Sequence, residues 1–200
     1  MGSADLPVAD RELRFVQHSA ARTRVLDAAL DLFAQHGVSG TSLQMIADHV
    51  GITKAAVYHQ FRTKDNVVLA VTERELGRLA PALEEAEAHG DRPQARDQLL
   101  VHVIDMAVRD RRLVRTLQFD PVVVRLLAEH EPFQRFMDRL YRVLLGEGED
   151  GPLEGAMLSG AISSGVMHPL VADVDDDTLR TKLTDMTRRL LGLPLTGTEG

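Results

Sequence analysis

The 200-residue sequence contains no cysteine and no tryptophan, and aromatic residues make up only 4% of it. The lack of cysteine excludes a disulfide framework, a thiolate metal site and a cysteine nucleophile, and a reducing compartment is the natural location. No apolar run approaches the roughly 18 residues that a membrane span needs, and the first residues lack the apolar core of a signal peptide. The sequence therefore predicts a cytoplasmic chain with no membrane partner.

The composition also favours one class of fold. Hydrophobic residues make up 44% of the chain and charged residues 26%, which is typical of a globular protein. With so few aromatics, the core must consist mainly of Leu, Val, Ala, Ile and Met, which suits helices better than sheets. We predict an all-α fold.

Charge is distributed unevenly along the chain. The formal net charge is −7, but residues 1–65 hold seven basic and seven acidic side chains, so the acidic surplus lies after residue 65. Phosphate binding depends on Lys and Arg that neutralise a polyanion. A neutral N-terminal part followed by an acidic body is the asymmetry expected if only the first part meets DNA.

The first part of the chain carries signals for two successive helices. Apolar residues recur at helical spacing over residues 25–33, and Gly37 is placed to end this helix. Residues 41–44, Thr-Ser-Leu-Gln, have the form of a capping box in which Thr41 caps a second helix. Gly51 supplies a left-handed residue to end it.

Two more helix starts follow at once. Thr53 is placed to cap a third helix over residues 54–61, and Thr63 a fourth that begins at Lys64. Two short helices joined by a turn of about three or four residues that contains glycine predict a helix-turn-helix motif.

The helical pattern continues beyond residue 64 with no strand-like alternation. Pro81 lies inside a continuous helical pattern, so we expect a kink or break there, which would divide this helix into a DNA-side and a pocket-side segment. The predicted helices span residues 64–80 continuing to about 89, 93–109, 111–118, 121–129, 132–146, 152–168 and 175–191.

A set of residues in fixed order over residues 20–70 points to a family. The set comprises Leu32-Phe33, Gly37, Thr41-Ser42, Ile46-Ala47, Gly51-Ile52-Thr53-Lys54, Tyr58, Phe61 and Lys64-Asp65. It resembles the DNA-binding domain of TetR-type (tetracycline-repressor-like) transcriptional regulators of bacteria. Ala55 departs from the pattern, because many relatives carry glycine there, and we expect it to alter base contact without disturbing the fold. The rest of the chain resembles the family in length, helicity and order of elements.

The resemblance implies an organisation and a function. Residues 1–18, with glycine, proline and mixed charges but no sustained period, predict a flexible arm, and residues 193–200 a flexible tail. Between them, the resemblance gives a helix-turn-helix DNA-binding domain (19–65) and a helical effector-binding and dimerisation domain (66–192). It implies a repressor that binds a palindromic operator on double-stranded DNA as a homodimer and is released by a small-molecule effector. Such a protein is cytoplasmic, and nucleoid-associated when bound to DNA. It needs no cofactor and no metal.

The same resemblance assigns the DNA contacts. The second helix of a helix-turn-helix pair enters the major groove with its N-terminal residues at base edges, so residues 54–56 are expected to read bases and the others to support the contact or meet phosphates. The alternatives are a merely solvated charge at Lys54, a packing role for Tyr58 and plain surface positions for the two arginines. The predicted DNA contacts are Arg22, Arg24, Thr41, Ser42, Thr53, Lys54, Ala55, Ala56, Tyr58, His59 and Lys64.

Two further sets of residues are predicted in the second domain. For the effector pocket, each candidate has plain core as its alternative; the set is His102, Met106, Phe119, Phe136, Met137 and Tyr141. In the family the last two long helices form the dimer interface, and small residues at four-residue spacing let a partner helix come close. These candidates are Gly155, Ala156, Ser159, Gly160, Ser163, Leu179, Leu183, Met186 and Leu190. The alternative is that the small residues only permit tight packing within one subunit.

The sequence gives little support for a metal-binding protein or an enzyme. The acidic run 173–177 fails as a calcium loop, because its sixth position is Thr178 and its twelfth is Thr184. The eight histidines form no HExxH motif, and nucleophile-elbow and phosphate-loop motifs are missing. We therefore predict that the chain is not an enzyme. The remaining alternative is a helical small-molecule binding or sequestering protein with a vestigial DNA-binding arm, which the retention of Lys54, Tyr58, His59 and Lys64 disfavours.

Overall fold

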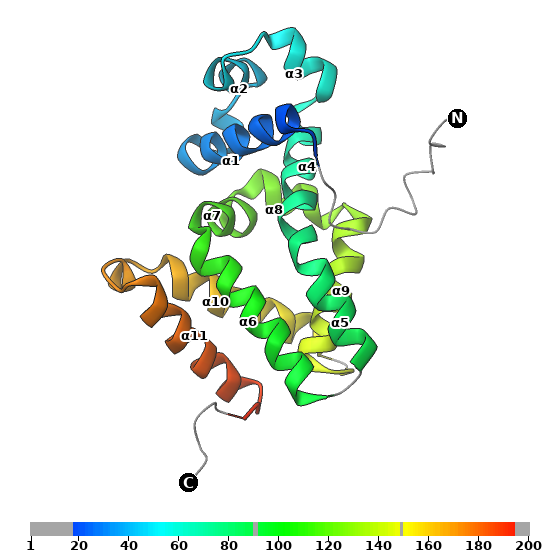
Figure 1. Ribbon diagram of the computed structural model, residues 1–200, viewed down its shortest axis with the longest axis vertical. Helices are drawn as coiled ribbons and strands as arrows, with labels where there is room; N and C mark the ends of the chain where they lie inside the picture. Colours follow the sequence, from blue (N-terminus) through cyan, green and yellow to red (C-terminus); the bar gives the residue numbers. More distant parts are fainter. Residues whose placement is uncertain (1–17, 90–91, 149, 195–200) are drawn as a thin grey trace.

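Helices form almost all of the structure, a computed structural model that describes residues 18–89, 92–148 and 150–194 (Figure 1). Within these ranges there is no strand, so the all-α prediction is confirmed. Most of the predicted arm and tail, residues 1–17 and 195–200, lies outside the described residues. The helices are α1 (Ala20–Gly40), α2 (Leu43–Val50), α3 (Lys54–Gln60), α4 (Lys64–Leu76), α5 (Ala80–His89), α6 (Pro93–Arg109), α7 (Arg111–Phe119), α8 (Pro121–Ala128), α9 (Glu131–Leu145), α10 (Gly151–Met167) and α11 (Asp176–Leu190), with short 3₁₀ turns at Gly77–Leu79 and Pro169–Val171.

Side-chain caps fix the starts of the first helices. The Thr53 hydroxyl accepts a hydrogen bond from the backbone N–H of Ala56, and Thr63 caps α4 in the same way, both as predicted. Gly51 ends α2 with φ of 75°, a left-handed conformation that suits glycine. Because the two helices are separated by so short a turn, α2 and α3 are held as a helix-turn-helix pair at one end of the molecule (Figure 1).

The predicted capping box at residues 41–44 is wrong by one position. Ser42 caps α2, its hydroxyl accepting from the Met45 N–H at 3.2 Å, and the Gln44 amide donates to the Asp48 carboxylate. Thr41 is buried and belongs to the end of α1 instead. That end is irregular, since Gly37 leaves helical geometry as predicted but a further turn continues to Gly40.

The helix-turn-helix end is built around one apolar core, to which later helices of the chain also contribute. Aliphatic residues of α1, α2, α3 and the first half of α4 pack together, among them Leu26, Ile46 and Val57, all of them fully buried. Leu113 of α7 and Val123 of α8 complete this cluster. The N-terminal helices are therefore seated on α7 and α8 as well as on α4.

A second core lies among α5, α6, α9, α10 and α11, together with the end of α4. The predicted break near Pro81 is confirmed, because a 3₁₀ turn at residues 77–79 separates α4 from α5. Proline has no N–H to donate to the carbonyl four residues earlier, so a regular helix cannot continue through it. α4 thus contributes to both cores.

Ion pairs fasten the outer helices of this second core. Arg188 on α11 makes a bidentate pair with Asp97 on α6, at 2.6 and 2.8 Å. Arg139 on α9 pairs in the same way with Glu87 on α5. α11 therefore has a fixed side toward α6 and leaves another side at the surface. No helix in the described ranges combines the length and apolar character needed to cross a membrane.

Candidate nucleic-acid interface, cavity and apolar face

The N-terminal part of α3 is presented to solvent. Lys54, Ala55, Tyr58 and His59 are exposed, and Ala56 is half-buried. The Lys54 ammonium lies 5.4 Å from the centre of the Tyr58 ring, within range of a cation–π contact. α3 is held from behind by a single buried residue, Val57, together with Phe61 just past its end. The predicted reading residues are thus at the surface, as a groove-binding helix requires.

The N-termini of α2 and α3 offer further hydrogen-bond donors. Ser42 and Thr53 are both exposed, with their hydroxyls engaged as caps. Helix N-termini carry unpaired N–H groups and a positive end, which suit phosphate oxygens. These two positions are therefore compatible with backbone phosphate contact.

Two predicted DNA contacts have their side chains committed inside the domain. Thr41 is only 3% exposed, and its hydroxyl lies 2.8 Å from the Gly37 carbonyl and 3.2 Å from that of Leu32. The Lys64 ammonium donates to the carbonyls of Val38, at 2.5 Å, and Thr41, at 2.9 Å. The last carbonyls of a helix lack helical partners, and these side chains satisfy them. The prediction of a side-chain DNA contact at Thr41 is therefore wrong, and Lys64 has a structural role that the sequence did not reveal.

The two arginines of α1 differ. Arg22 is half-buried, with its guanidinium 4.3 Å from the centre of the Phe61 ring, so it helps to hold the end of α3. Arg24 is exposed on the same helix. The alternative to a DNA contact, a plain surface position, therefore fits Arg24 and does not fit Arg22.

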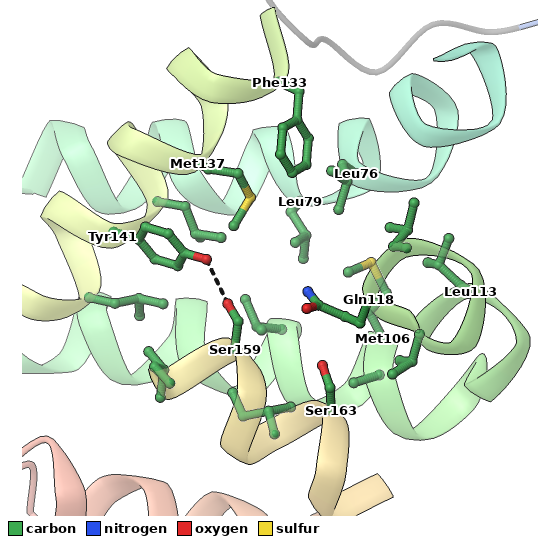
Figure 2. Close-up of a pocket in the computed structure, with 18 residues that line it drawn as sticks. Leu76, Leu79, Met106, Leu113, Gln118, Phe133, Met137, Tyr141, Ser159 and Ser163 are labelled. Carbon is green, nitrogen blue, oxygen red and sulfur yellow. Dashed lines mark hydrogen bonds between the residues drawn. The ribbon is translucent and has the colours of Figure 1, made fainter. Parts of the chain in front are cut away.

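A cavity of about 110 Å³ lies in the second core, between α4, α6, α7, α9 and α10 (Figure 2). The Tyr141 hydroxyl and Ser159 Oγ face each other in its wall at 2.6 Å. Burial raises the pKa of the Tyr141 hydroxyl above its ordinary value, and the hydrogen bond with Ser159 opposes part of that rise. Its walls are formed by Leu76, Leu79, Val103, Met106, Ala107, Leu113, Val114, Leu117, Gln118, Phe133, Met137, Leu140, Tyr141, Leu144, Leu158, Ser159, Ile162 and Ser163.

The cavity includes half of the predicted pocket residues. Met106, Met137 and Tyr141 line it. Phe136 is plain core, 2% exposed. Two predictions are wrong: His102 is exposed on α6, with its ring nitrogen 2.8 Å from the Gln98 carbonyl, and Phe119 is exposed at the end of α7 beside another hollow.

Sequence reasoning found Tyr141 but missed the other polar residues of this cavity. These are Gln118, Ser159 and Ser163, and the two serines were assigned to the dimer interface. The four-residue spacing on α10 was the available signal, because it places Gly155, Ser159 and Ser163 on one face. That face points into the subunit.

Tight packing explains the glycine at the start of this inward face. A Cβ at Gly155 would lie 2.5 Å from the nearest Tyr141 ring carbon, a distance that real Cβ atoms do not show. Ser163 is buried, and Leu179 of α11 is buried in the core. For Gly155, Ser163 and Leu179 the prediction of an exposed dimer contact is wrong, and the alternative of packing within one subunit holds.

The opposite side of α10 and the neighbouring side of α11 form an apolar face. We call this set the α10–α11 face: Leu153, Ala156, Met157, Gly160 and Ala161 of α10 with Met186 and Leu190 of α11, all exposed. Met157 is 68% exposed and Leu190 72%. Four of its members, Ala156, Gly160, Met186 and Leu190, are predicted interface residues; Ser159 and Leu183 are half-buried between the face and the core.

Known proteins share this helix-turn-helix end. Residues 25–71 match the family model described as "Bacterial regulatory proteins, tetR family". This part of the chain is a TetR-type DNA-binding domain. AcrR of Shigella flexneri, named as an HTH-type transcriptional regulator, is 37% identical over 94 residues, which cover 46% of this chain and 43% of that protein. YezE of Bacillus subtilis, named as an HTH-type transcriptional regulator, is 27% identical over 142 residues, which cover 66% of this chain and 72% of that protein.

Solved structures share the fold over most of this chain. The fatty acid degradation regulator FadR of Bacillus halodurans superimposes with a TM-score of 0.67, covering 92% of this chain and 99% of that one at 18% identity. FadR of Bacillus subtilis, solved in complex with stearoyl-CoA, gives 0.64 with 84% and 96% covered, also at 18% identity. At this identity the likeness is one of fold.

Proposed function

We propose that this chain is a ligand-responsive transcriptional repressor, which binds a palindromic operator as a homodimer and leaves it when a small molecule occupies the cavity. The observation that carries the proposal is the double role of α7. Leu113, Val114 and Leu117 line the cavity, while Leu113 also belongs to the core of the helix-turn-helix end. One helix thus touches both the candidate ligand site and the candidate DNA reader.

The DNA-reading role rests on α3. Lys54 is placed to donate to guanine O6 or N7, and the Ala55 methyl to contact a thymine methyl. Tyr58 and His59 lie one turn further along the exposed side, where phosphates flank the groove. One such helix reads few base pairs, so a useful specificity ratio requires a second copy and a two-fold symmetric site.

We assign the contact between the two copies to the α10–α11 face. Large exposed apolar side chains such as Met157, Met186 and Leu190 are unfavourable in water and mark an interface when they gather on one surface. Two copies that pair through this face form a bundle of four helices, the arrangement that the family resemblance implies.

Release requires that the ligand bind more tightly to an arrangement that cannot hold DNA. The Asp120 carboxylate links α1 to α8: it accepts from the Val38 N–H at the end of α1, at 2.7 Å, and from the N–H groups that begin α8. Asp120 lies two residues after Gln118 of the cavity wall. A ligand that moves α7 is therefore expected to pull on the end of α1.

The first test is selection of bound duplexes from a random DNA pool, at two salt concentrations. Enrichment of a palindrome, with affinity that falls steeply as salt rises, is the expected result. If the folded protein enriches no sequence, the proposal fails and the small-molecule sequestering alternative takes its place.

A matched pair of variants tests the dimer. Met157→Glu places a charge in the α10–α11 face, whereas Val124→Glu places it at an exposed apolar position on α8. We expect sedimentation to show a monomer for the first variant and a dimer for the second, with operator binding lost in parallel. A dimeric Met157→Glu variant would contradict the assigned interface.

A further inference from the structure

The cavity wall carries no charged side chain. Most of its members are aliphatic residues or methionine, and the polar groups are those of Gln118, Tyr141, Ser159 and Ser163. All four are neutral at physiological pH, because the amide and the serine hydroxyls do not ionise there and a tyrosine hydroxyl ionises only in alkaline conditions. Burial raises the pKa of the Tyr141 hydroxyl further. A ligand in this cavity therefore meets neutral hydrogen-bonding groups on a largely apolar surface.

From this wall we infer the chemical class of the effector: a small, uncharged, mostly apolar molecule, about one six-membered ring in size, with a single hydroxyl or carbonyl group that meets Tyr141 and Ser159. The inference rests on the proposed function, because it takes this cavity as the effector site. It goes further by stating which molecules the site accepts and which it rejects.

The lack of charge follows from the cost of burying an ion. Moving an ionised carboxylate or ammonium out of water is very unfavourable unless a partner of opposite charge is buried with it. None of the lining residues supplies such a partner. An organic acid or amine of the right shape is thus rejected by the same wall that accepts its neutral analogue.

The size follows from the volume. The cavity measures about 110 Å³. An engineered cavity of about 150 Å³ binds benzene, so a single ring is near the upper limit here. Met106 and Met137 line opposite parts of the wall (Figure 2), and their flexible side chains provide the small extra space that a ring needs. A stearoyl-CoA-like ligand exceeds both the volume and the charge that the wall accepts.

The single polar group follows from the hydroxyl pair. Tyr141 and Ser159 have two hydroxyl hydrogens, and the hydrogen bond between them uses one. The other hydrogen remains available as a donor, and both oxygens keep acceptor capacity. A ligand oxygen beside this pair gains a hydrogen bond without leaving a buried group unpaired. Tyr141 is fixed for this role by contact with Gly155.

Binding of six-membered ring probes tests the inference directly. The probes are cyclohexanol, cyclohexanecarboxylate and cyclohexylamine at pH 7, measured by calorimetry on the intact chain without DNA. We expect cyclohexanol to bind and the two charged rings to show no binding at concentrations where cyclohexanol saturates. Equal or tighter binding of either charged ring overturns the inference.

The chain's two tyrosines provide a matched control. Tyr141→Phe removes the hydroxyl in the cavity, and Tyr58→Phe removes the same atom from an exposed position on α3. We expect cyclohexanol affinity to fall about two- to tenfold in the first variant, the loss of one hydrogen bond, and to stay unchanged in the second. Equal affinities in all three proteins would contradict the assigned polar contact.

A filled cavity provides an independent check of position. Ala107→Leu adds three carbon atoms to the wall of the cavity and should abolish cyclohexanol binding. Its fold is checked by circular dichroism, and Ala88→Leu on the exposed side of α5 shows the effect of the same change elsewhere. Undiminished binding to a folded Ala107→Leu variant overturns the inference.

Operator release separates this inference from the proposed function. If cyclohexanol binds as expected but leaves the operator complex intact, the ligand class stands and the proposed release mechanism fails. If instead a charged ring releases the operator and cyclohexanol does not bind, the protein remains a ligand-responsive regulator and the inferred class is wrong.

Discussion

Lys64 can act in two ways, and one variant distinguishes them. Its ammonium lies 2.5 Å from the Val38 carbonyl and 2.9 Å from the Thr41 carbonyl, at the irregular end of α1. The family resemblance assigns the same residue to a DNA phosphate. Lys64→Met removes the charge while keeping the length and apolar character of the side chain.

The expected loss of stability can be worked out from these contacts. A hydrogen bond that involves a charged group contributes about 1.5–3 kcal/mol when buried, and a cation at a helix C-terminus adds about 0.3–1 kcal/mol. Lys64 is half-exposed, so solvent offsets part of both terms. We expect the free energy of unfolding to fall by about 2 kcal/mol, since the Val38 carbonyl loses its charged donor.

Urea unfolding and salt-dependent DNA binding together give the answer. The structural role predicts reduced stability, with an unchanged slope of log affinity against log salt for the folded protein. A phosphate contact instead predicts unchanged stability and a slope shallower by about 0.9. Lys54→Met is the control, because Lys54 is exposed on α3 and its loss should weaken operator binding while changing stability by less than about 0.5 kcal/mol. Unchanged stability together with a shallower salt slope in Lys64→Met would refute the structural role.

Three further predictions concern the second core. Gly155→Ala should lower the free energy of unfolding by about 1–3 kcal/mol because its Cβ meets the Tyr141 ring, whereas Gly148→Ala, with open space around it and outside the α10–α11 face, should be neutral or stabilising in the same urea titration. In a spectrophotometric titration, Tyr141 should ionise above the ordinary tyrosine pKa, because burial raises its pKa in the folded protein. The stability that its protonated form contributes should therefore decline as pH rises from the ordinary tyrosine pKa towards the folded one. The hydrogen bond from Arg139 lowers the pKa of Glu87. The stability that this pair contributes should therefore be present at neutral pH and be lost as pH falls below the ordinary glutamate pKa. If Glu87→Gln leaves the decline of stability at acidic pH unchanged, this prediction is contradicted.

Most of the fold could be predicted from local signals in the sequence. Each helix from α6 to α11 begins and ends within about one residue of its predicted bounds, because proline, glycine and capping side chains act on their immediate neighbours. The one wrong cap, Thr41 in place of Ser42, arose where two adjacent residues could both cap. Burial of Thr41 against the end of α1 decides between them, and burial depends on contacts distant in sequence.

The site depended more on such distant contacts. Periodicity identifies the inward side of a helix, but whether that side meets a void or a packed neighbour is settled by the other helices. Phe136 and Met137 are adjacent in sequence, yet one is plain core and the other lines the cavity. The small residues of α10 carried a valid signal of close approach, but the partner at Gly155 is an aromatic ring of the same subunit.

The sharing of the first core has a consequence for protein engineering. Leu113 and Val123 complete the packing of the helix-turn-helix end, although both lie far beyond it in sequence. A fragment cut after α4 would present the apolar surface that these residues cover, so the DNA reader is not a separable module. Sensor chimeras that exchange ligand domains between such proteins should therefore carry α7 and α8 along with the reader, with sequence junctions placed on the far side of those two helices.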